Sequence, residues 1–209
     1  MANGDTVVAQ STPYGYSGVG VVRVSGPEAL KILGDLSGMS KNKLHTIKPR
    51  VAHRGTVFDE NKDPFDDVIF TLYKKPKSYT GEDVFEVSCH GSPYILKYII
   101  DLCINYGARP AGPGEFTKRA FINGKIDLMQ AESVANMVSA SSHRGVNIAL
   151  NGLRGSLSEE INVMRDEIID ILSYSEHLLD VSEEDLTDAD ISYITDKTSK
   201  TQKILQNLL

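Results

Sequence analysis

Residues 84–105 have the sequence VFEVSCHGSPYILKYIIDLCIN, and this stretch decides the fold class. Val84–Cys89 is an apolar run of a length normal for a β-strand. From Pro93 to Asn105 the apolar residues recur at helical spacing, and Gly107 supplies a helix stop. A strand that is followed directly by an amphipathic helix predicts an α+β layer rather than an all-helical or all-β domain.

Upstream of this stretch, apolar runs broken by Gly, Pro and Asp turn signals predict three more strands. These are Val19–Val24, Val51–Phe58 and Asp67–Tyr73. Between the first two, Pro27–Leu36 is predicted to be helical, with proline at the first helical position. We therefore expect an N-terminal mixed β-sheet domain with helices, an α+β fold over residues 1–120.

After Pro113 the apolar residues keep a helical period, which predicts an α-helical domain segment over residues 121–209. Leu128–Val138 forms one periodic run, and Leu150–Ile171 forms one long amphipathic stripe typical of a helix-bundle core. Ser182–Asp190 is expected to be an acidic loop. Ile191–Leu209 is expected to be a helix without a stop signal, and its pairing with one neighbour would leave an apolar face exposed.

Composition narrows the function class. The chain has 209 residues, 41% of them hydrophobic and 24% charged, and a net charge of −6, which is typical of a globular protein rather than a disordered one. No stretch has the length of a spanning helix and the start lacks a signal-peptide pattern, so we expect a cytoplasmic protein with no membrane association. Two isolated cysteines predict no metal site, and the acidic balance argues against a chain that grips nucleic acid over its whole surface.

Three charged residues stand out as candidate ligand contacts. Arg23 extends from an apolar strand, so it either forms a structural ion pair or clamps a carboxylate or stacks on a ring. Glu86 lies between Phe85 and Val87, so it either forms a cross-strand salt bridge or accepts paired N–H donors from a heterocycle. Lys125 lies near a helix start, where anions are preferred, so it is either an ordinary exposed lysine or serves a nearby ligand.

Catalytic chemistry is not predicted for this chain. Cys89 and His90 point to opposite faces of a strand, so a buried structural cysteine is favoured over a thiol nucleophile, and a nucleophilic hydrolase is a weak competitor. The glycines of residues 5–26 match neither a dinucleotide fingerprint nor a P-loop, so we expect no GTP hydrolysis here.

Four sequence motifs, in order, resemble the tRNA-modifying GTPases of the TrmE (MnmE) family. They are D-T-x-x-A-x-x-T-P, G-V-G-x-x-R-x-S-G, S-x-T-G-E-D followed by H-G, and P-G-E-F-T-x-R-A-F-x-N-G-K-x-D-L-x-Q-A-E. The resemblance is strong over Thr6–Ser139 and weaker afterwards. It implies an N-terminal domain related to folate-dependent one-carbon enzymes, then the first part of a helical domain, with the chain ending before an inserted GTPase domain.

The resemblance also implies cofactors and partners. Proteins of this family act with the flavoprotein MnmG (GidA) to modify C5 of the wobble uridine in certain tRNAs, and they form homodimers through the N-terminal domain. The implied cofactors are 5-formyl-tetrahydrofolate, and GTP with Mg²⁺ and K⁺ in the GTPase domain. By motif, Arg23, Glu86 and Lys125 match the family's folate contacts. The family's C-terminal tetrapeptide, with its reactive cysteine and last folate contact, lies outside this sequence.

The sequence departs from the family pattern at two places. Tyr16 and Ser17 stand where the family more often has Arg and Gly, and Val181-Ser182 replaces a usual Phe-Pro.

Two alternative functions remain open: a stand-alone folate-dependent one-carbon transferase, and a dimerisation scaffold without activity of its own. The first requires turnover by this chain alone, and the second requires dimers that ignore folate.

Overall fold

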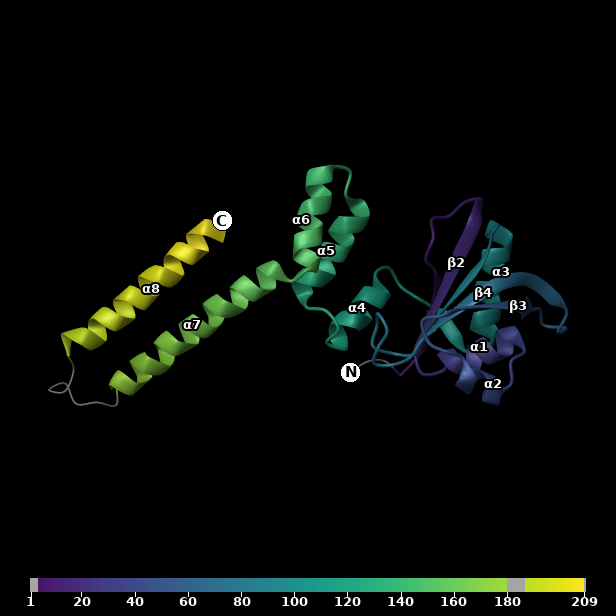
Figure 1. The fold of residues 1–209 in the computed structure, drawn as a ribbon, viewed down its shortest axis with the longest axis horizontal. Helices are drawn as coiled ribbons and strands as arrows, with labels where there is room; N and C mark the ends of the chain where they lie inside the picture. The colour runs from purple at the N-terminus through teal and green to yellow at the C-terminus, as the bar shows by residue number, and fades with distance from the viewer. Residues whose placement is uncertain (1–3, 180–186, 209) are drawn as a thin grey trace. The chain divides into compact units, whose positions relative to one another are not determined.

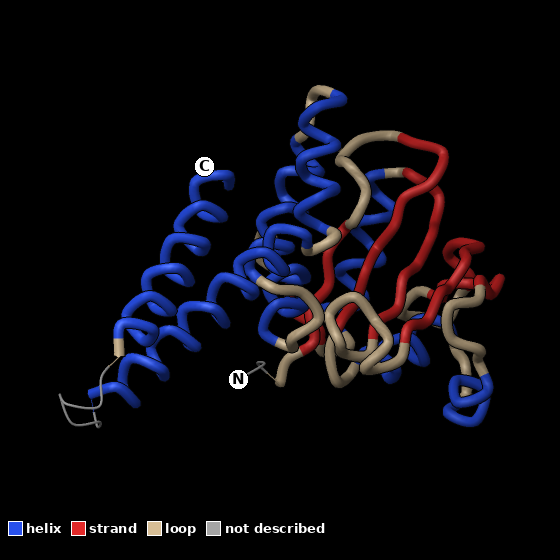
Figure 2. The backbone as a smooth tube through the Cα atoms, turned by 60° about the vertical axis from the view of Figure 1, so that its left-hand side comes forward, coloured by secondary structure: helices blue, strands red, loops and turns tan. Residues whose placement is uncertain are grey.

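The structure, a computed structural model that describes residues 4–179 and 187–208, divides into two compact units. Unit 1 is Met1–Asp127 and unit 2 is Leu128–Leu209. Helix α4 (Glu115–Ile122) belongs to unit 1. All described strands lie in unit 1, and the described part of unit 2 consists of helices and their connections (Figures 1 and 2).

Unit 1 is built on a six-stranded sheet with the order β3-β4-β5-β2-β1-β6. Every pair of neighbours is antiparallel except β1 and β6, which run parallel. The strands are β1 (Thr6–Gln10), β2 (Ser17–Ser25), β3 (Ala52–Phe58), β4 (Pro64–Tyr73), β5 (Val84–Gly91) and β6 (Ala108–Pro110). The mixed sheet with helices confirms the predicted α+β class.

Helices cover one face of this sheet and form the core with it. α1 (Ala29–Ser37) and α3 (Pro93–Asn105) contact the strands and each other, and α2 (Lys41–Thr46) packs on α1. The core is continuous because alternate strand residues and one stripe of each helix point into it. Its largest fully buried side chains include Phe70, Phe85, Ile32, Leu33 and Leu96. Burial of each such side chain stabilises the fold by about 1.5–3 kcal/mol.

The opposite face of the sheet carries Arg23 and Glu86, two of the three candidate ligand contacts. Because side chains alternate along a strand, buried Val22 and Val24 in β2 place Arg23 on the other face. Buried Phe85 and Val87 do the same for Glu86 in β5. This open face is therefore where a ligand can reach the sheet.

Three elements of unit 1 are absent from the sequence prediction. β1 is the short run TVVAQ, which pairs antiparallel with β2. β6 has only three residues and ends in Pro110, so it carries little sequence signal and is formed by parallel pairing with β1. α2 has six residues, and its start is capped by the Ser40 hydroxyl, which accepts from the Lys43 N–H at 3.4 Å.

The described residues of unit 2 form four helices: α5 (Leu128–Ser139), α6 (His143–Leu153), α7 (Ser156–Leu179) and α8 (Asp188–Leu208). The prediction of one uninterrupted stripe over Leu150–Ile171 was wrong. Gly155 has φ +79°, a left-handed conformation that ends α6 before α7 begins. No described helix has both the length and the apolar character needed to cross a bilayer.

The acidic loop expected at Ser182–Asp190 does not extend to Asp190, because helix α8 begins at Asp188. Residues 180–186, which include Val181-Ser182, lie outside the described residues. Asp188 already belongs to α8, where it and Asp190 occupy the first turn. Acidic residues are favourable there because the helix N-terminus carries partial positive charge.

Candidate functional site

Arg23 and Glu86 face each other across β2 and β5. They are register partners, and the Arg23 Nε and Nη2 atoms both lie 2.7 Å from Glu86 Oε1. The Tyr73 hydroxyl donates to Glu86 Oε2 at 3.3 Å. The two side chains are 29% and 20% exposed, so the pair is partly buried but accessible. The cross-strand ion pair that the sequence left open for each residue is thus the observed arrangement.

Aromatic rings from two other elements flank the Arg23 guanidinium. Its Cζ lies 5.9 Å from the Tyr79 ring centroid and 5.5 Å from that of Phe116 in α4. The Tyr79 hydroxyl is 2.9 Å from the Thr117 hydroxyl, which joins the loop to the helix. Arg23 therefore has an ion-pair partner in Glu86 and two aromatic neighbours within the range of cation–π interactions.

Burial beside a carboxylate affects Tyr73. Its pKa is raised, first by desolvation and then by the neighbouring Glu86. A phenol that keeps its proton remains a donor, so Tyr73 can donate to Glu86 Oε2 throughout the neutral pH range.

Lys125 lies at a different position, against the loop of residues 78–83. It lines a hollow of about 500 Å³ with Gly81 and Lys75, and neither Arg23 nor Glu86 lines that hollow. Gly81 has φ +77°, and a Cβ there would come within 3.2 Å of Lys125 Cγ. The structure thus brings Arg23 and Glu86 together directly, and the loop links them to Lys125 because its Tyr79 contacts Arg23 and its Gly81 packs on Lys125.

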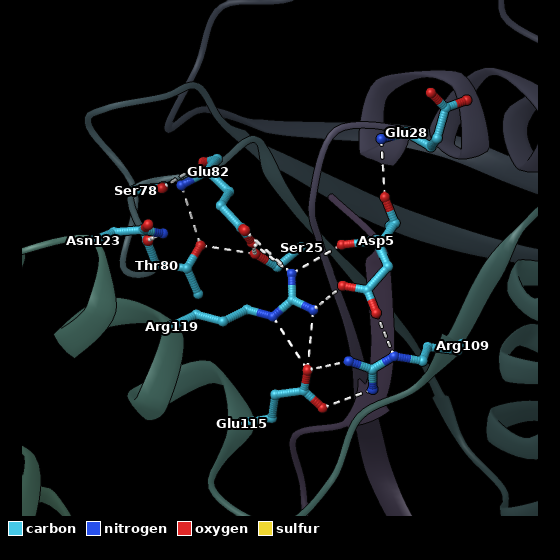
Figure 3. A network of polar contacts seen from close by, with 11 residues as sticks. Asp5, Ser25, Glu28, Ser78, Thr80, Glu82, Arg109, Glu115, Arg119 and Asn123 are labelled. Carbon is cyan, nitrogen blue, oxygen red and sulfur yellow. Dashed lines mark hydrogen bonds and ion pairs between the residues drawn. The ribbon is translucent and has the colours of Figure 1, made fainter. Parts of the chain in front are cut away.

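The loop and α4 are fastened by a buried arginine that the sequence prediction missed (Figure 3). Arg119 is only 6% exposed and binds three carboxylates. Its Nη2 lies 2.8 Å from Asp5 Oδ1 and 3.0 Å from Glu115 Oε1, and its Nη1 lies 3.1 Å from Glu82 Oε1. A buried charge is tolerated only when it is paired in this way.

A second arginine closes the network around Glu115. Arg109 binds Asp5 through Nε at 2.5 Å and Glu115 through Nη2 at 2.5 Å. The Arg109 hydrogen bond is the main cause that lowers the pKa of Glu115 to about 2, with further lowering by the Gly112 N–H and Arg119. The same arginine is the main cause of a lowered pKa at Asp5. These contacts join the start of the chain, β6 and α4 in one cluster.

Smaller polar contacts fix the loop itself. The Ser25 hydroxyl bonds both Thr80 Oγ1 and Glu82 Oε2 at 2.7 Å, and Asn123 Nδ2 donates to the Thr80 carbonyl at 2.7 Å. The loop that carries Tyr79 is therefore held from the sheet on one side and from the end of α4 on the other (Figure 3).

Two family profiles match the chain almost end to end. The profile described as "GTP-binding protein TrmE N-terminus" matches residues 6–125, and the profile described as "MnmE helical domain" matches residues 128–209. The chain belongs to the TrmE (MnmE) family. Both matches follow the division into units seen in the structure.

Curated relatives carry the name "tRNA modification GTPase MnmE". The Cytophaga hutchinsonii protein is 42% identical over 98% of this chain and 44% of its own length. The Aquifex aeolicus protein is 43% identical over 87% of this chain and 40% of its own length, and the Staphylococcus epidermidis protein is 36% identical over 98% and 45%. The chain thus spans less than half the length of these relatives.

The TrmE motifs supply most of the buried ion network. Asp5 belongs to D-T, Glu82 to T-G-E-D, and Glu115 and Arg119 to G-E-F-T-x-R-A. The sequence did show that these four residues belong to family motifs. It could not show that they pair, because no spacing rule relates residues such as Asp5 and Arg119 that lie more than a hundred positions apart. Only the folded chain shows that the motifs meet and position the loop beside Arg23.

Cys89 is a structural residue, as expected. It is 3% exposed, its thiol is 3.4 Å from the Gly20 carbonyl, and burial raises its pKa to about 11. His90 instead turns to Asp66, with Nδ1 2.6 Å from Asp66 Oδ1. A protonated thiol with no base beside it is a poor nucleophile, so the structure gives no support to a thiol hydrolase.

Proposed function

We propose that this chain is the tetrahydrofolate-binding and dimerising N-terminal part of a tRNA modification GTPase. With MnmG, that protein would modify C5 of the wobble uridine, using 5-formyl-tetrahydrofolate as the one-carbon donor. GTP, Mg²⁺ and K⁺ would bind in a GTPase domain encoded beyond Leu209, which agrees with the share of the relatives that this chain covers. Residues 1–120 would form the folate-binding domain and residues 121–209 the first part of the helical domain.

The observation that carries the folate assignment is the Arg23–Glu86 pair beside two aromatic rings on the open face of the sheet. A reduced pterin presents adjacent N–H donors on a flat heterocycle, and a carboxylate accepts such donors in pairs. Within the described part of the chain, Glu86 Oε2 accepts one hydrogen bond, from the Tyr73 hydroxyl at 3.3 Å, so this oxygen retains acceptor capacity. Tyr79 and Phe116 supply the apolar walls that a flat ring requires.

Lys125 suits the other end of the ligand. A folate carries a glutamate tail whose carboxylates attract lysine and arginine side chains. Lys125 is exposed, and it borders a hollow of about 500 Å³, within the volume range of small-molecule sites. We therefore assign Glu86 to the N–H donors of the pterin, Arg23 to the face of the pterin ring, and Lys125 to the glutamate tail.

Calorimetric titration with 5-formyl-tetrahydrofolate tests the assignment. Glu86→Ala is expected to cost about 1.5–3 kcal/mol, or roughly tenfold to a hundredfold in affinity. Glu60→Ala removes an exposed carboxylate of the same charge and is expected to leave the affinity unchanged. Equal folate affinity in wild type and Glu86→Ala would refute the site.

Light scattering on the same samples tests the proposed dimer, because it measures the molecular mass in solution. A monomer at every concentration would contradict the dimer.

The GTPase assignment has a separate test. The gene sequence downstream of Leu209 is expected to encode a G-x-x-x-x-G-K-[ST] motif, because the chain spans less than half the length of its relatives, which are named as GTPases. The full-length product should then hydrolyse GTP, whereas the 209-residue chain should not. A stop codon directly after Leu209 would remove the support for a GTPase and favour a stand-alone folate protein.

A further inference from the structure

Five cations gather on two neighbouring segments at one end of the sheet. Lys48 and Arg50 precede β3, and Lys74, Lys75 and Lys77 follow β4. We call these five residues the basic patch. They come from segments 47–53 and 74–80, neither of which contains an aspartate or glutamate. Such a concentration is unusual in a chain with a net charge of −6.

Hydrogen bonds hold the two segments of the basic patch together. The Arg50 N–H donates to the Leu72 carbonyl at 2.7 Å, and Arg50 Nη2 donates to the Lys77 carbonyl at 2.8 Å. The Lys77 N–H donates to the Lys74 carbonyl at 2.8 Å, which closes a turn. Arg50 adopts φ +62°, which is uncommon for a residue with a side chain. The cations are therefore presented on a defined surface rather than on two independent loops.

The charges of the basic patch are not neutralised within the part of the chain that the structure describes. None of the five forms an ion pair there, whereas Lys31, Arg54 and Lys97 each pair with a carboxylate. Two acids lie nearby in sequence, and both are engaged: Glu82 binds Arg119, and Asp83 Oδ1 accepts the Lys75 backbone N–H at 3.0 Å. Lys48, Arg50, Lys75 and Lys77 are exposed, and Lys74 is half-buried.

We propose that the basic patch binds the phosphate backbone of the tRNA on which the protein acts. This inference rests on the proposed function, since a protein that modifies tRNA must hold it, and clustered unpaired lysine and arginine side chains are what phosphates select. The contact positions the RNA and reads no base, because ammonium and guanidinium groups that meet phosphates carry no sequence information, and the hollow beside Lys75 is the one assigned to the folate tail. A local basic patch also explains how a chain with a net charge of −6 can bind RNA, because the phosphates meet only the positive charges of the patch.

Fluorescence anisotropy of a labelled, unmodified tRNA transcript tests the proposal with the 209-residue chain. The patch variant combines Lys48→Gln, Lys74→Gln and Lys77→Gln. Glutamine preserves the backbone hydrogen bonds and most of the side-chain length. Because three phosphate contacts are lost, the affinity at low salt is expected to fall about tenfold, and the slope of log K against log salt is expected to become shallower by about two.

A matched control removes the same charge elsewhere in unit 1. It combines Lys31→Gln, Lys43→Gln and Lys97→Gln on helices α1, α2 and α3, all exposed. This variant is expected to bind tRNA within about twofold of wild type, with the salt slope retained. Circular dichroism on both variants verifies that the fold is intact.

Three outcomes overturn the proposal: equal tRNA binding by the patch and control variants, no tRNA binding by the wild-type chain at low salt, or binding to phosphatidylserine vesicles in place of tRNA. Each is distinguishable from failure of the proposed function. Folate affinity and the downstream P-loop do not depend on Lys48, Lys74 or Lys77, so those results can stand while the basic patch is refuted.

Discussion

Units 1 and 2 use apolar residues in opposite ways. In unit 1, two helices and a sheet enclose a continuous core whose members are almost fully buried. In unit 2, Ala149 and Met164 are the buried apolar side chains among the residues described, while Val138 and Leu179 are 84% exposed. Both units have clear amphipathic patterns, so pattern alone does not determine burial. A face is buried only when a second layer is available to cover it.

Charged side chains are also more deeply buried in unit 1 than in unit 2. In unit 1, Arg119 is 6% exposed and holds three carboxylates. In unit 2, α7 and α8 are joined by ion pairs such as Lys197–Asp170, whose members are 30% and 67% exposed. Exposed pairs contribute about 0–1 kcal/mol, whereas loss of one partner in a buried cluster is far more costly. Unit 1 is thus expected to be the more cooperative and stable part.

The largest expected effect tests the contrast in apolar burial. Phe85→Ala removes a fully buried ring and is expected to lower the free energy of unfolding by about 4 kcal/mol. Ile168→Ala in α7, where the side chain is 55% exposed, is expected to change it by less than about 0.5 kcal/mol. Urea unfolding followed by circular dichroism measures both. Equal costs would show that the face of α7 is covered in solution.

The second contrast concerns buried and exposed arginines. Arg119→Met leaves Asp5, Glu82 and Glu115 without their shared cation and is expected to cost about 3 kcal/mol. Arg165→Met, which breaks an exposed pair with Asp166, is expected to be neutral within about 0.5 kcal/mol. Hydrogen exchange by mass spectrometry should show faster exchange in residues 78–83 and α4 of the Arg119 variant only. Unchanged exchange there would mean that the network does not hold the loop.

Acid sensitivity gives a smaller effect confined to unit 1. The pKa of Glu115 is lowered from 4.5 to about 2, so its contribution is fully present above pH 4.5 and is lost as the pH falls toward 2. The sign follows because the unfolded chain binds the proton first. Glu115→Gln is expected to flatten the decline in unfolding free energy over that window, and Glu28→Gln, an exposed acid, is not. A decline of the same steepness in wild type and Glu115→Gln would assign the acid sensitivity to other groups.

The smallest effect concerns the break between α6 and α7. Gly155 has φ +79°, and a Cβ there would meet only Gln130 Nε2 at 3.4 Å, so the cost of Gly155→Ala is conformational. We expect a loss of about 1 kcal/mol in the unfolding of unit 2. Asn151→Ala, in the interior of α6, should be neutral or slightly stabilising because alanine has the higher helix propensity. Stabilisation by Gly155→Ala would indicate that α6 and α7 join into one helix in solution.

Local pattern was sufficient for most elements and insufficient for their ends and partners. Apart from the six-residue α2, the strands and helices of residues 19–105 were predictable because apolar periodicity and Gly or Pro signals coincide there. β6 was not predictable, since three residues become a strand only when β1 lies beside them. The stripe from Leu150 to Ile171 concealed a break because the apolar residues keep their three- and four-residue spacing across Gly155, whether or not the helix continues through it.

The sequence by itself determined the fold class, the family and the identity of Arg23 and Glu86 as unusual charges in apolar strands. The tertiary structure decided which partner each charge has. It paired Arg23 with Glu86, placed Lys125 in a separate hollow beside the same loop, and gathered Asp5, Glu82 and Glu115 around Arg119. The physical reason is range: periodicity and capping act over a few residues, whereas ion pairs depend on distances in space that only the folded backbone sets.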